Sequence, residues 1–200
     1  RSAYRSAFPA DLSLYSIGIR VVRNAADASG SIVSTNRANA DAPVGNTLIV
    51  YFSQTGNTQG FAEIIQEMTG ADLFRIERAT PYSSTHNSQG LYAEALEEYR
   101  ESASPELNAY LEDAGLDINQ YDTILLGYSN WWASIPAPVR TFLNHYDLSG
   151  KTIIPFCSMG GGFFGQTISA VAKLAPSSNM REGLCVTYTA YDRNEIVQWL

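Results

Sequence analysis

The residues best suited to chemistry form a short polar loop at positions 53–58, which read SQTGNT and directly follow the apolar run TLIVYF. A strand that leads into a helix here would direct backbone N–H groups and a helix N-terminus at a bound anion. Hydroxyl and amide side chains add neutral donors, and a glycine allows close approach or a positive φ. These residues are Ser53, Gln54, Thr55, Gly56, Asn57 and Thr58.

The loop lacks the signatures of the common nucleotide sites. It contains no lysine, which excludes the Walker pattern, and the sequence around it does not read GxGxxG, which excludes the usual dinucleotide fingerprint. We therefore predict a site in which neutral groups hold a terminal phosphate monoester. The alternative is an ordinary strand-to-helix turn with a Ser/Thr cap.

Two further loops follow apolar runs. The segment YSNWWASIPAP at 128–138 carries the adjacent indoles of Trp131 and Trp132. An outward indole could stack on a flat heterocycle, whereas an inward one would pack beneath the loop. The segment CSMGGGFFGQ at 157–166 has a glycine-rich backbone that could line the edge of a planar ring, with Phe163 and Phe164 either closing over it or packing on the next helix. The three loops together predict a ligand with a phosphate, a polyol arm and a flat ring system.

These loops need a scaffold that brings them together. Five apolar runs are expected to be strands, at 47–52, 72–77, 123–128, 152–157 and 184–189. Helical patterns separate them, which is typical of βαβ units and of a parallel sheet covered on both faces. The three loops would then meet at the carboxyl edge of the sheet, where such folds bind ligands. Pro155 lies inside the fourth run, so we expect an irregularity there.

Apolar residues at helical spacing predict the helices. The first should lie between a cap at Asn57 or Thr58 and a stop at Gly70. Others are expected around 139–146 and 168–174, and a last one begins near Asn194.

The segment 80–122 is too long for a simple crossover and is interpreted as an insertion. It carries two helical patterns, the first formed by Tyr92, Leu96 and Tyr99 and the second by Leu107, Tyr110 and Leu111. The first pattern has acidic positions at Glu94, Glu97, Glu98 and Glu101. We interpret them as a solvated helix face rather than a docking patch.

The composition changes near residue 46, where a stretch of small and polar residues ends. We predict a remnant of an upstream domain, or an extension, at 1–23, a linker at 24–46 and one α/β domain at 47–200. The chain has 13 Lys and Arg against 20 Asp and Glu, a net charge of −7 and no basic cluster, so nucleic acid and anionic membrane surfaces are not expected partners. No apolar run reaches the roughly 20 residues of a membrane-spanning helix.

The remaining reactive side chains give few signals. Cys157 and Cys185 form no CxxC pair, and their apolar neighbours favour reduced core residues, with a disulfide between them as the alternative. His86 and His145 are interpreted as solvated or structural, and no catalytic residue or metal ligand is predicted. Because the chain begins at Arg1, we expect a fragment or a processed form of a protein; its location stays open between the cytoplasm, which we favour, and export.

The segments IVYFSQTGNT, YDTILLGYSNWWASIPAPV and DLSGKTIIPFCSMGGGFFG resemble the flavodoxin family, particularly its small bacterial flavodoxin-like branch, over about residues 47–200. The resemblance implies a doubly wound five-stranded parallel sheet of order 2-1-3-4-5, FMN as cofactor and electron transfer. It also implies that residues 53–58 cradle the phosphate, 129–133 flank the flavin ring and 158–163 line its pyrimidine edge. The cofactor-binding residues in the last two groups are Ser129, Asn130, Trp131, Trp132, Ala133, Ser158, Gly160, Gly161, Gly162 and Phe163.

One position departs from the family, and one segment resembles another family. Flavodoxins commonly have glycine where this sequence has Ala133, so the backbone flip that favours one-electron chemistry is not carried over from the resemblance. The segments RSAYR and IGIRVVR, within residues 1–23, are similar to the end of a formylglycine-generating-enzyme-like, or sulfatase-modifying-factor-like, domain. That similarity implies such a domain upstream; the alternative is an unrelated extension.

Three functions are compatible with these residues. The first is an FMN-binding flavodoxin-like redox protein that transfers electrons, with a redox partner protein whose basic surface complements the acidic chain. The second is an NAD(P)H-dependent quinone or flavin reductase of the same fold, whose pocket the insertion would shape. The third is a non-catalytic flavodoxin-fold module attached to another domain. The oligomeric state does not follow from the sequence.

Overall fold

The computed structural model describes residues 46–84, 89–160, 163–187 and 191–200. Its strands are β1 (Thr47–Phe52), β2 (Asp72–Ile76), β3 (Thr123–Ser129), β4 (Thr152–Met159), β5 (Asn179–Met180) and β6 (Leu184–Thr187). Its α-helices are α1 (Asn57–Thr69), α2 (Leu91–Glu101), α3 (Ala137–His145), α4 (Thr167–Leu174) and α5 (Arg193–Trp199). The predicted N-terminal segment and nearly all of the predicted linker lie outside the described residues.

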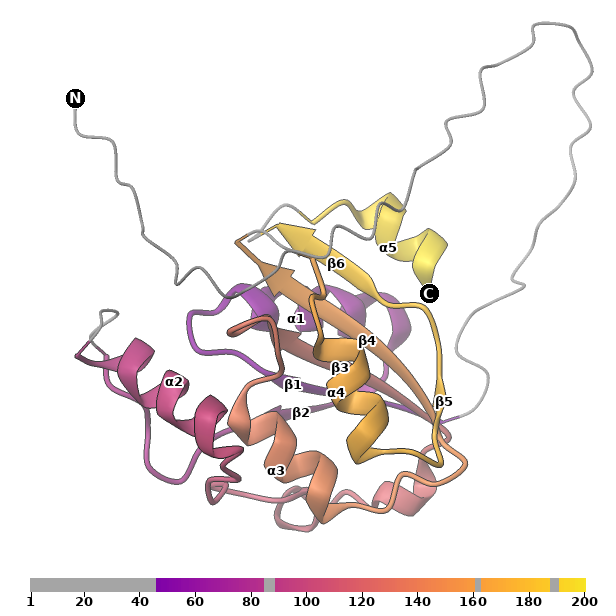
Figure 1. Ribbon diagram of the computed structural model, residues 1–200. Helices are drawn as coiled ribbons and strands as arrows, with labels where there is room; N and C mark the ends of the chain where they lie inside the picture. The colour runs from indigo at the N-terminus through magenta and orange to yellow at the C-terminus, as the bar shows by residue number, and fades with distance from the viewer. Residues whose placement is uncertain (1–45, 85–88, 161–162, 188–190) are drawn as a thin grey trace, which may run out of the picture. The chain divides into compact units, whose positions relative to one another are not determined.

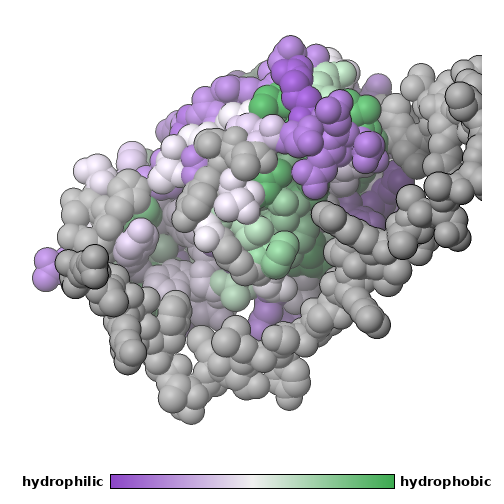
Figure 2. All heavy atoms as spheres, turned by 90° about the horizontal axis from the view of Figure 1, so that it is seen from above, coloured by the Kyte–Doolittle hydropathy of each residue, from purple (hydrophilic) through white to green (hydrophobic). Residues whose placement is uncertain are grey.

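The strands form one parallel sheet in the order β2-β1-β3-β4-β5, and β6 also pairs with β4. Phe61 of α1 and Ile196 of α5 belong to the core on one face, whereas Val139 of α3 and Val171 of α4 belong to the core on the other. Figure 1 shows α3 and α4 in front of the sheet and α1 behind it. Figure 2, a view from above, shows apolar surface next to strongly hydrophilic surface. The predicted doubly wound class and strand order are confirmed.

The fifth strand position is divided between two short strands, whereas a single strand at 184–189 was predicted. β5 pairs with the first two residues of β4, and β6 pairs with the last four. The gap between them lies opposite Pro155, which has no N–H to offer a neighbouring strand. β4 itself keeps its register with β3 through Pro155. The irregularity predicted from this proline is therefore a break in the adjacent strand.

Gly183 precedes β6 at this break. A Cβ atom there would lie 2.5 Å from the carbonyl oxygen of Pro155 and 2.6 Å from the ring of Phe164. The close approach to Pro155 thus requires glycine, because no side chain fits.

Helix α1 is capped by Gly56, not by Asn57 or Thr58 as predicted. Gly56 has a φ of 88°, and no side chain caps the helix. Glycine reaches this left-handed conformation without the steric cost that other residues meet, which explains its use at the turn. Gly70, with a φ of 69°, ends the helix as predicted.

The pattern that predicted α2 does not mark its buried face. Tyr92 and Tyr99 are 50% and 43% exposed. The buried positions are Leu91, Ala95 and Glu98. The helix is therefore turned so that a carboxylate, rather than the tyrosines, faces inward.

The prediction of a second α-helix in the insertion, around Leu107, is wrong. Leu107 forms an isolated antiparallel bridge with Arg78. Its neighbours exchange backbone hydrogen bonds of 2.8 and 2.9 Å with Glu77 and Ala79, which follow β2. Backbone groups that are paired in this way cannot form the hydrogen bonds of an α-helix. Between this bridge and β3 the structure has two short 3-10 helices, Leu111–Ala114 and Ile118–Gln120.

Candidate functional site

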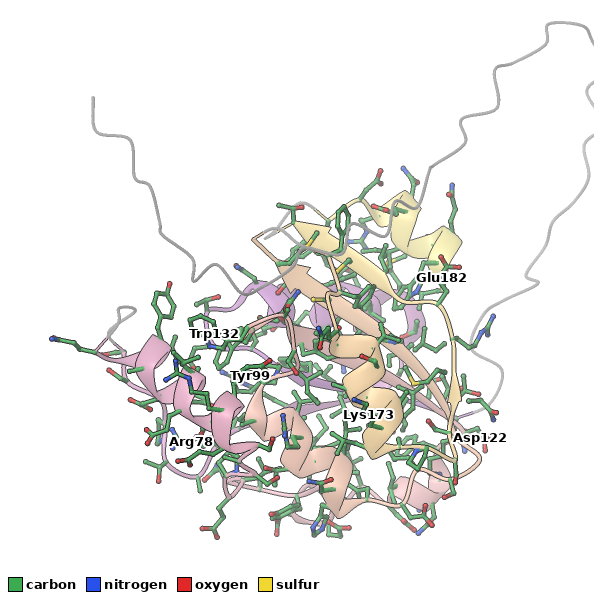
Figure 3. The ribbon with its side chains drawn as sticks, viewed as in Figure 1. Arg78, Tyr99, Asp122, Trp132, Lys173 and Glu182 are labelled. Atoms are coloured by element: carbon green, nitrogen blue, oxygen red, sulfur yellow. The ribbon has the colours of Figure 1, made fainter. Side chains whose placement is uncertain are left out.

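A pocket of about 400 Å³ lies at the carboxyl edge of the sheet, beyond the ends of β1, β3 and β4. Figure 3 labels Trp132, which follows β3, and Asp122, which precedes it at the other end of the strand. The volume is within the range of small-molecule sites. The lining residues are uncharged: Gln54, Thr55, Asn57, Leu91, Tyr92, Ala95, Ser129, Asn130, Trp131, Trp132, Ser158, Met159 and Gly160.

The loop at 53–58, which we call the SQTGNT loop, forms one wall of the pocket. Gln54, Thr55 and Asn57 line the pocket directly. The buried hydroxyl of Ser53 accepts a hydrogen bond from the N–H of Gly56 at 3.2 Å, which closes the loop on itself. Neutral side chains and the start of α1 thus lie together, as binding of an anion requires.

Arg75, on β2, lies against this loop, although the sequence analysis did not connect it with the site. Its guanidinium donates to the carbonyl oxygen of Ser53 at 3.3 Å and to Oε1 of Gln59 at 3.4 Å. It also pairs with Glu77 at 3.1 Å. The only sequence signal is its place on a strand that pairs in parallel with β1. Because it is ion-paired and partly exposed, its attraction for an anion should be modest.

Three hydroxyl groups join the three loops behind the pocket. The Thr58 hydroxyl lies 2.7 Å from the Ser158 hydroxyl and 3.0 Å from the Ser129 hydroxyl. Ser129 and Ser158 are 3.4 Å apart. Thr58 and Ser158 are almost completely buried, so the hydrogen bond between them is shielded from water. The hydroxyl of Thr58 therefore fixes the loops to one another in this structure, although the sequence suggested that it would face a phosphate.

Residues 131–134, which we call the tryptophan turn, carry backbone strain. The N–H of Trp131 donates to the carbonyl of Ser134 at 3.0 Å, and the reverse bond is 2.8 Å. The two central residues, Trp132 and Ala133, have φ values of 53° and 58°. Positive φ at both central positions is the signature of a type I′ turn, which favours Asn and Gly. A side chain in this conformation costs about 1–2 kcal/mol, so neighbouring groups must hold the turn.

The third loop supplies part of that support. The N–H of Gln166 donates to the carbonyl of Ala133 at 2.7 Å. Gly165, itself at a φ of 55°, packs so closely that an added Cβ would lie 3.2 Å from Cα and Cβ of Ala133. The side-chain amide of Asn130 also donates to the carbonyl of Phe163 at 2.6 Å. These contacts tie the tryptophan turn to the segment that follows β4.

Asn130 also carries an unused acceptor. Within the part of the chain that the structure describes, its Oδ1 atom is buried and has no hydrogen-bond partner. Asn130 lines the pocket. A buried acceptor without a donor is costly, so this oxygen is suited to an N–H group of a ligand.

The two tryptophans have different environments. The ring of Trp131 meets Phe52 and Tyr82 edge to face, with 5.4 Å between ring centroids in both pairs. Trp132 is 42% exposed. The two tryptophans thus follow the two alternatives given for an indole in this loop. The indole of Trp131 packs beneath the loop, and that of Trp132 is exposed and available to a ligand.

A partly buried ion cluster fixes α2 beside Trp131. The Tyr82 hydroxyl donates to the Glu98 carboxylate in a short hydrogen bond. Arg78 pairs with Glu98 at 3.3 Å and with Glu94 at 3.1 Å, and its guanidinium lies 4.6 Å from the centre of the Tyr82 ring. Burial raises the pKa of the Glu98 carboxyl. The prediction that Glu98 belongs to a solvated face is wrong, because Glu98 is buried and is paired with Tyr82 and Arg78.

Helix α2 also forms a wall that the sequence analysis missed. Leu91, Tyr92 and Ala95 line the pocket, as does Met159 at the end of β4. The spacing of Tyr92 and Tyr99 on α2 gave no sign that only Tyr92 reaches the site. That distinction depends on how the Glu98 cluster turns the helix.

The predicted site residues take three kinds of position. Those that line the pocket are Gln54, Thr55, Asn57, Ser129, Asn130, Trp131, Trp132, Ser158 and Gly160. Those in the same loops but outside the lining are Ser53, Gly56, Thr58, Ala133 and Phe163. Gly161 and Gly162 lie outside the described residues.

The described ranges show neither a candidate metal centre nor a candidate membrane span. They contain no group of three or more His, Cys, Asp or Glu side chains that could hold a metal ion. No helix in them is long and apolar enough to cross a membrane. His145 packs against the ring of Tyr110 in a tilted arrangement with 4.2 Å between centroids, in keeping with a structural role, and His86 lies outside the described residues.

A doubly wound parallel sheet with a pocket at its carboxyl edge defines the class of α/β ligand-binding proteins. Comparison with family models narrows this class, because the flavodoxin model matches residues 46–200. The chain belongs to the flavodoxin family. A search of curated proteins finds no match.

Solved structures agree with this assignment. A Bacteroides eggerthii protein assigned as a flavoprotein is 30% identical, with a TM-score of 0.66 over 78% of this chain and 96% of that one. A similar Bacteroides uniformis protein is 26% identical, with a TM-score of 0.67 over 78% and 97%. A Lactobacillus acidophilus flavoprotein solved in complex with FMN is 22% identical, with a TM-score of 0.61 over 78% and 98%, and shows the same fold.

Proposed function

We propose that the domain binds FMN in this pocket and acts as a flavodoxin-like redox protein that transfers electrons. The observation that carries the proposal is the meeting of the SQTGNT loop, the tryptophan turn and the end of β4 around one uncharged pocket. Membership of the flavodoxin family and the FMN complex of the Lactobacillus acidophilus protein support the choice of ligand.

The residues around the pocket fit FMN. The SQTGNT loop offers neutral donors and the start of α1 to the phosphate. Trp132 offers a partly exposed indole to the flat ring, and Oδ1 of Asn130 offers an acceptor to a ring N–H. The lining residues carry no formal charge, which suits a neutral ring system.

When bound, FMN would supply the electron chemistry, while the chain supplies binding and electrostatics. The net charge of −7 opposes the addition of negative charge to the protein and should lower the potential of the bound flavin. The same charge would attract a redox partner protein with a basic surface. Weaker association with that partner at high salt would follow.

A titration of the apo-protein with FMN, followed by flavin fluorescence, tests the proposal. We expect strong quenching by FMN and much weaker binding of riboflavin, which lacks the phosphate. Thr55→Ala should weaken FMN binding selectively, whereas Trp132→Ala should weaken both ligands. Equal binding of the two flavins, or no binding, would contradict the proposal.

A second candidate function is an NAD(P)H-dependent quinone or flavin reductase. The observation that favours it is the wall formed by Leu91, Tyr92 and Ala95, which leaves the pocket bounded by α2 as well as by the loops. Such a wall could hold a second planar substrate beside the flavin. Rapid NADPH oxidation by the FMN-loaded protein with a quinone would support this function, and no turnover with a range of donors and acceptors would exclude it.

A further inference from the structure

The only two cysteines of the chain lie opposite each other in the sheet. Cys157 of β4 and Cys185 of β6 are paired residues of adjacent parallel strands. Both belong to the same hydrophobic core, in which Cys157 is buried and Cys185 packs at its margin. Their side chains therefore project from the same face of the sheet. No part of the proposed flavin chemistry uses them.

The spacing of the strands brings the two residues within range of a disulfide. Neighbouring strands lie about 4.8 Å apart, and the Cα atoms of disulfide-bonded cysteines are usually about 4.4–6.8 Å apart. Interaction with Cys185, together with burial, raises the pKa of the Cys157 thiol. Cys157 is thus a poor first nucleophile but is well placed to react with an oxidised Cys185.

We propose that Cys157 and Cys185 form a thiol-oxidation site, in which a hydroperoxide oxidises Cys185 and Cys157 then closes an intramolecular disulfide. The assignment follows from exposure. Cys185 is partly exposed and open to a small oxidant, whereas Cys157 has no exposed surface. Oxidation at the accessible thiol would therefore come first.

The two steps balance. In the first, the Cys185 sulfur, which gives its proton to water, attacks one peroxide oxygen; an S–O bond forms, the O–O bond breaks, and the leaving oxygen takes up a proton to become water or an alcohol. In the second, the Cys157 sulfur attacks the sulfenic sulfur of Cys185; an S–S bond forms, the S–O bond breaks, and hydroxide leaves as water with the proton of Cys157. The thiols lose two electrons in total, and the hydroperoxide gains them.

The proposed site adjoins the pocket without being part of it. The Cys157 thiol contacts the carbonyl oxygen of Ser158 at 3.5 Å, and the Ser158 hydroxyl belongs to the cluster that joins the three loops. In the other direction, Cys157 is in register with Tyr128 of β3. Closing the disulfide would draw β6 and β4 together next to this cluster.

The experiment treats the native protein with hydrogen peroxide, blocks remaining thiols with N-ethylmaleimide in denaturant and measures the intact mass. We expect the loss of both alkylatable thiols, a decrease in mass equal to two hydrogen atoms, and a peptide pair linking Cys157 to Cys185. A dithiol should restore both thiols. The assay needs no flavin, so its outcome is separate from that of the FMN titration.

Single-cysteine variants provide the control. In Cys185→Ser, Cys157 should stay alkylatable after the same treatment because it is buried; in Cys157→Ala, Cys185 should proceed to sulfenic and higher acids. Three results with the native protein would overturn the proposal: sulfinic acid at Cys185 with Cys157 still a thiol, a disulfide between two molecules, or two unreacted thiols under conditions that oxidise the unfolded chain. Because the native protein decides the matter, a variant that fails to fold does not obscure it.

Discussion

The SQTGNT loop and the tryptophan turn face the same pocket but are built in opposite ways. The loop meets its need for a positive φ with Gly56, around which no atom lies within 4 Å of an added Cβ. The turn places Trp132 and Ala133 in a left-handed conformation that disfavours them. The loop therefore avoids backbone strain by having glycine at the position that needs it. The turn keeps its strained conformation only because neighbouring residues hold it there.

The supports of the two regions differ accordingly. Hydroxyl groups of Thr58, Ser129 and Ser158 anchor the base of the SQTGNT loop. The tryptophan turn is held by an aromatic contact with Tyr82 and by close packing on Gly165. Strain held by neighbours is common at ligand sites, because it keeps a side chain where the ligand needs it. In this pocket, the strained turn presents the exposed indole.

Gly165→Ala should produce the largest loss of stability, because it disturbs the close packing that holds the tryptophan turn. Alanine at position 165 would have to adopt a φ of 55°, and its methyl group would crowd Ala133. We expect the free energy of unfolding to fall by about 2–3 kcal/mol, as measured by urea denaturation. The matched control is Gly56→Ala, which meets only the backbone penalty and should cost about 1 kcal/mol. Equal losses would show that packing against Gly165 does not hold the turn.

Thr58→Val tests the hydroxyl anchor of the loop. Valine keeps the shape of threonine but leaves the buried Ser158 hydroxyl without its shortest hydrogen bond. We expect a loss of about 2 kcal/mol in the free energy of unfolding. Thr69→Val on the same helix is the control, because the bonds of the Thr69 hydroxyl are local: it donates to the Ile65 carbonyl and accepts from the N–H of Ala71, two residues further on. Indistinguishable variants would mean that the hydroxyl cluster does not stabilise the fold.

Glu98→Gln tests the ion cluster behind the turn through pH. Burial raises the pKa of Glu98 in the folded protein, so the folded chain keeps this proton to a higher pH than the unfolded chain. Its contribution to stability is complete below the unfolded pKa of about 4.3 and is lost as pH rises through the folded value. Removing this titration should make the fall of stability with pH shallower by up to about 1.4 kcal/mol per pH unit.

Urea denaturation at a series of pH values from about pH 4 to about pH 7 measures this slope. The range covers the titration of a glutamate whose pKa is ordinary or raised. Glu101→Gln on the same helix is the control, because Glu101 is exposed. If the free energy of unfolding of Glu98→Gln changes with pH as steeply as that of the wild type, the Glu98 carboxyl is not a source of the pH dependence.

The sequence predicted the sheet and its loops because both depend on local patterns. Apolar runs and helical spacing predicted the parallel sheet, and Gly70 predicted the end of α1, whereas the strand order was implied by the resemblance to flavodoxins. The wall formed by α2 was missed, because the spacing of Tyr92 and Tyr99 is the same whichever side of the helix is buried. The choice is made by Glu98, whose partners Arg78 and Tyr82 are distant in the sequence.

The conformation of the tryptophan turn could not be predicted for a similar reason. Residues 131–134 contain no Asn or Gly, so local turn preferences argue against positive φ at Trp132 and Ala133. The contacts of Ala133 with Gly165 and Gln166 come from the loop after the next strand. Tertiary contacts therefore override the local preference for Asn or Gly at these two positions.

Tyr92→Ala asks whether the α2 wall serves the same ligand as the tryptophan turn. If the flavin ring contacts Tyr92, loss of the aromatic ring should weaken FMN binding by about 1 kcal/mol, or roughly fivefold in Kd. Riboflavin should be affected equally, because the change leaves the phosphate contacts intact. Tyr99→Ala is the matched control: this tyrosine is also exposed on α2 but does not line the pocket. Unchanged FMN binding in Tyr92→Ala would leave the α2 wall free for a second substrate.

Ala133→Gly should have the smallest effect, because two contributions nearly cancel. Glycine relieves the cost of a side chain at a φ of 58°, but it also gives the unfolded chain more freedom. We expect a net gain of at most about 0.5 kcal/mol in the free energy of unfolding. Ser102→Gly, at a φ of 53° at the end of α2 and away from the pocket, should give a similar gain. The two variants should differ in flavin binding: only Ala133→Gly frees the backbone beside Trp132, so only it should alter FMN affinity. If both leave FMN affinity unchanged, the strain in the tryptophan turn has no role in holding the ring.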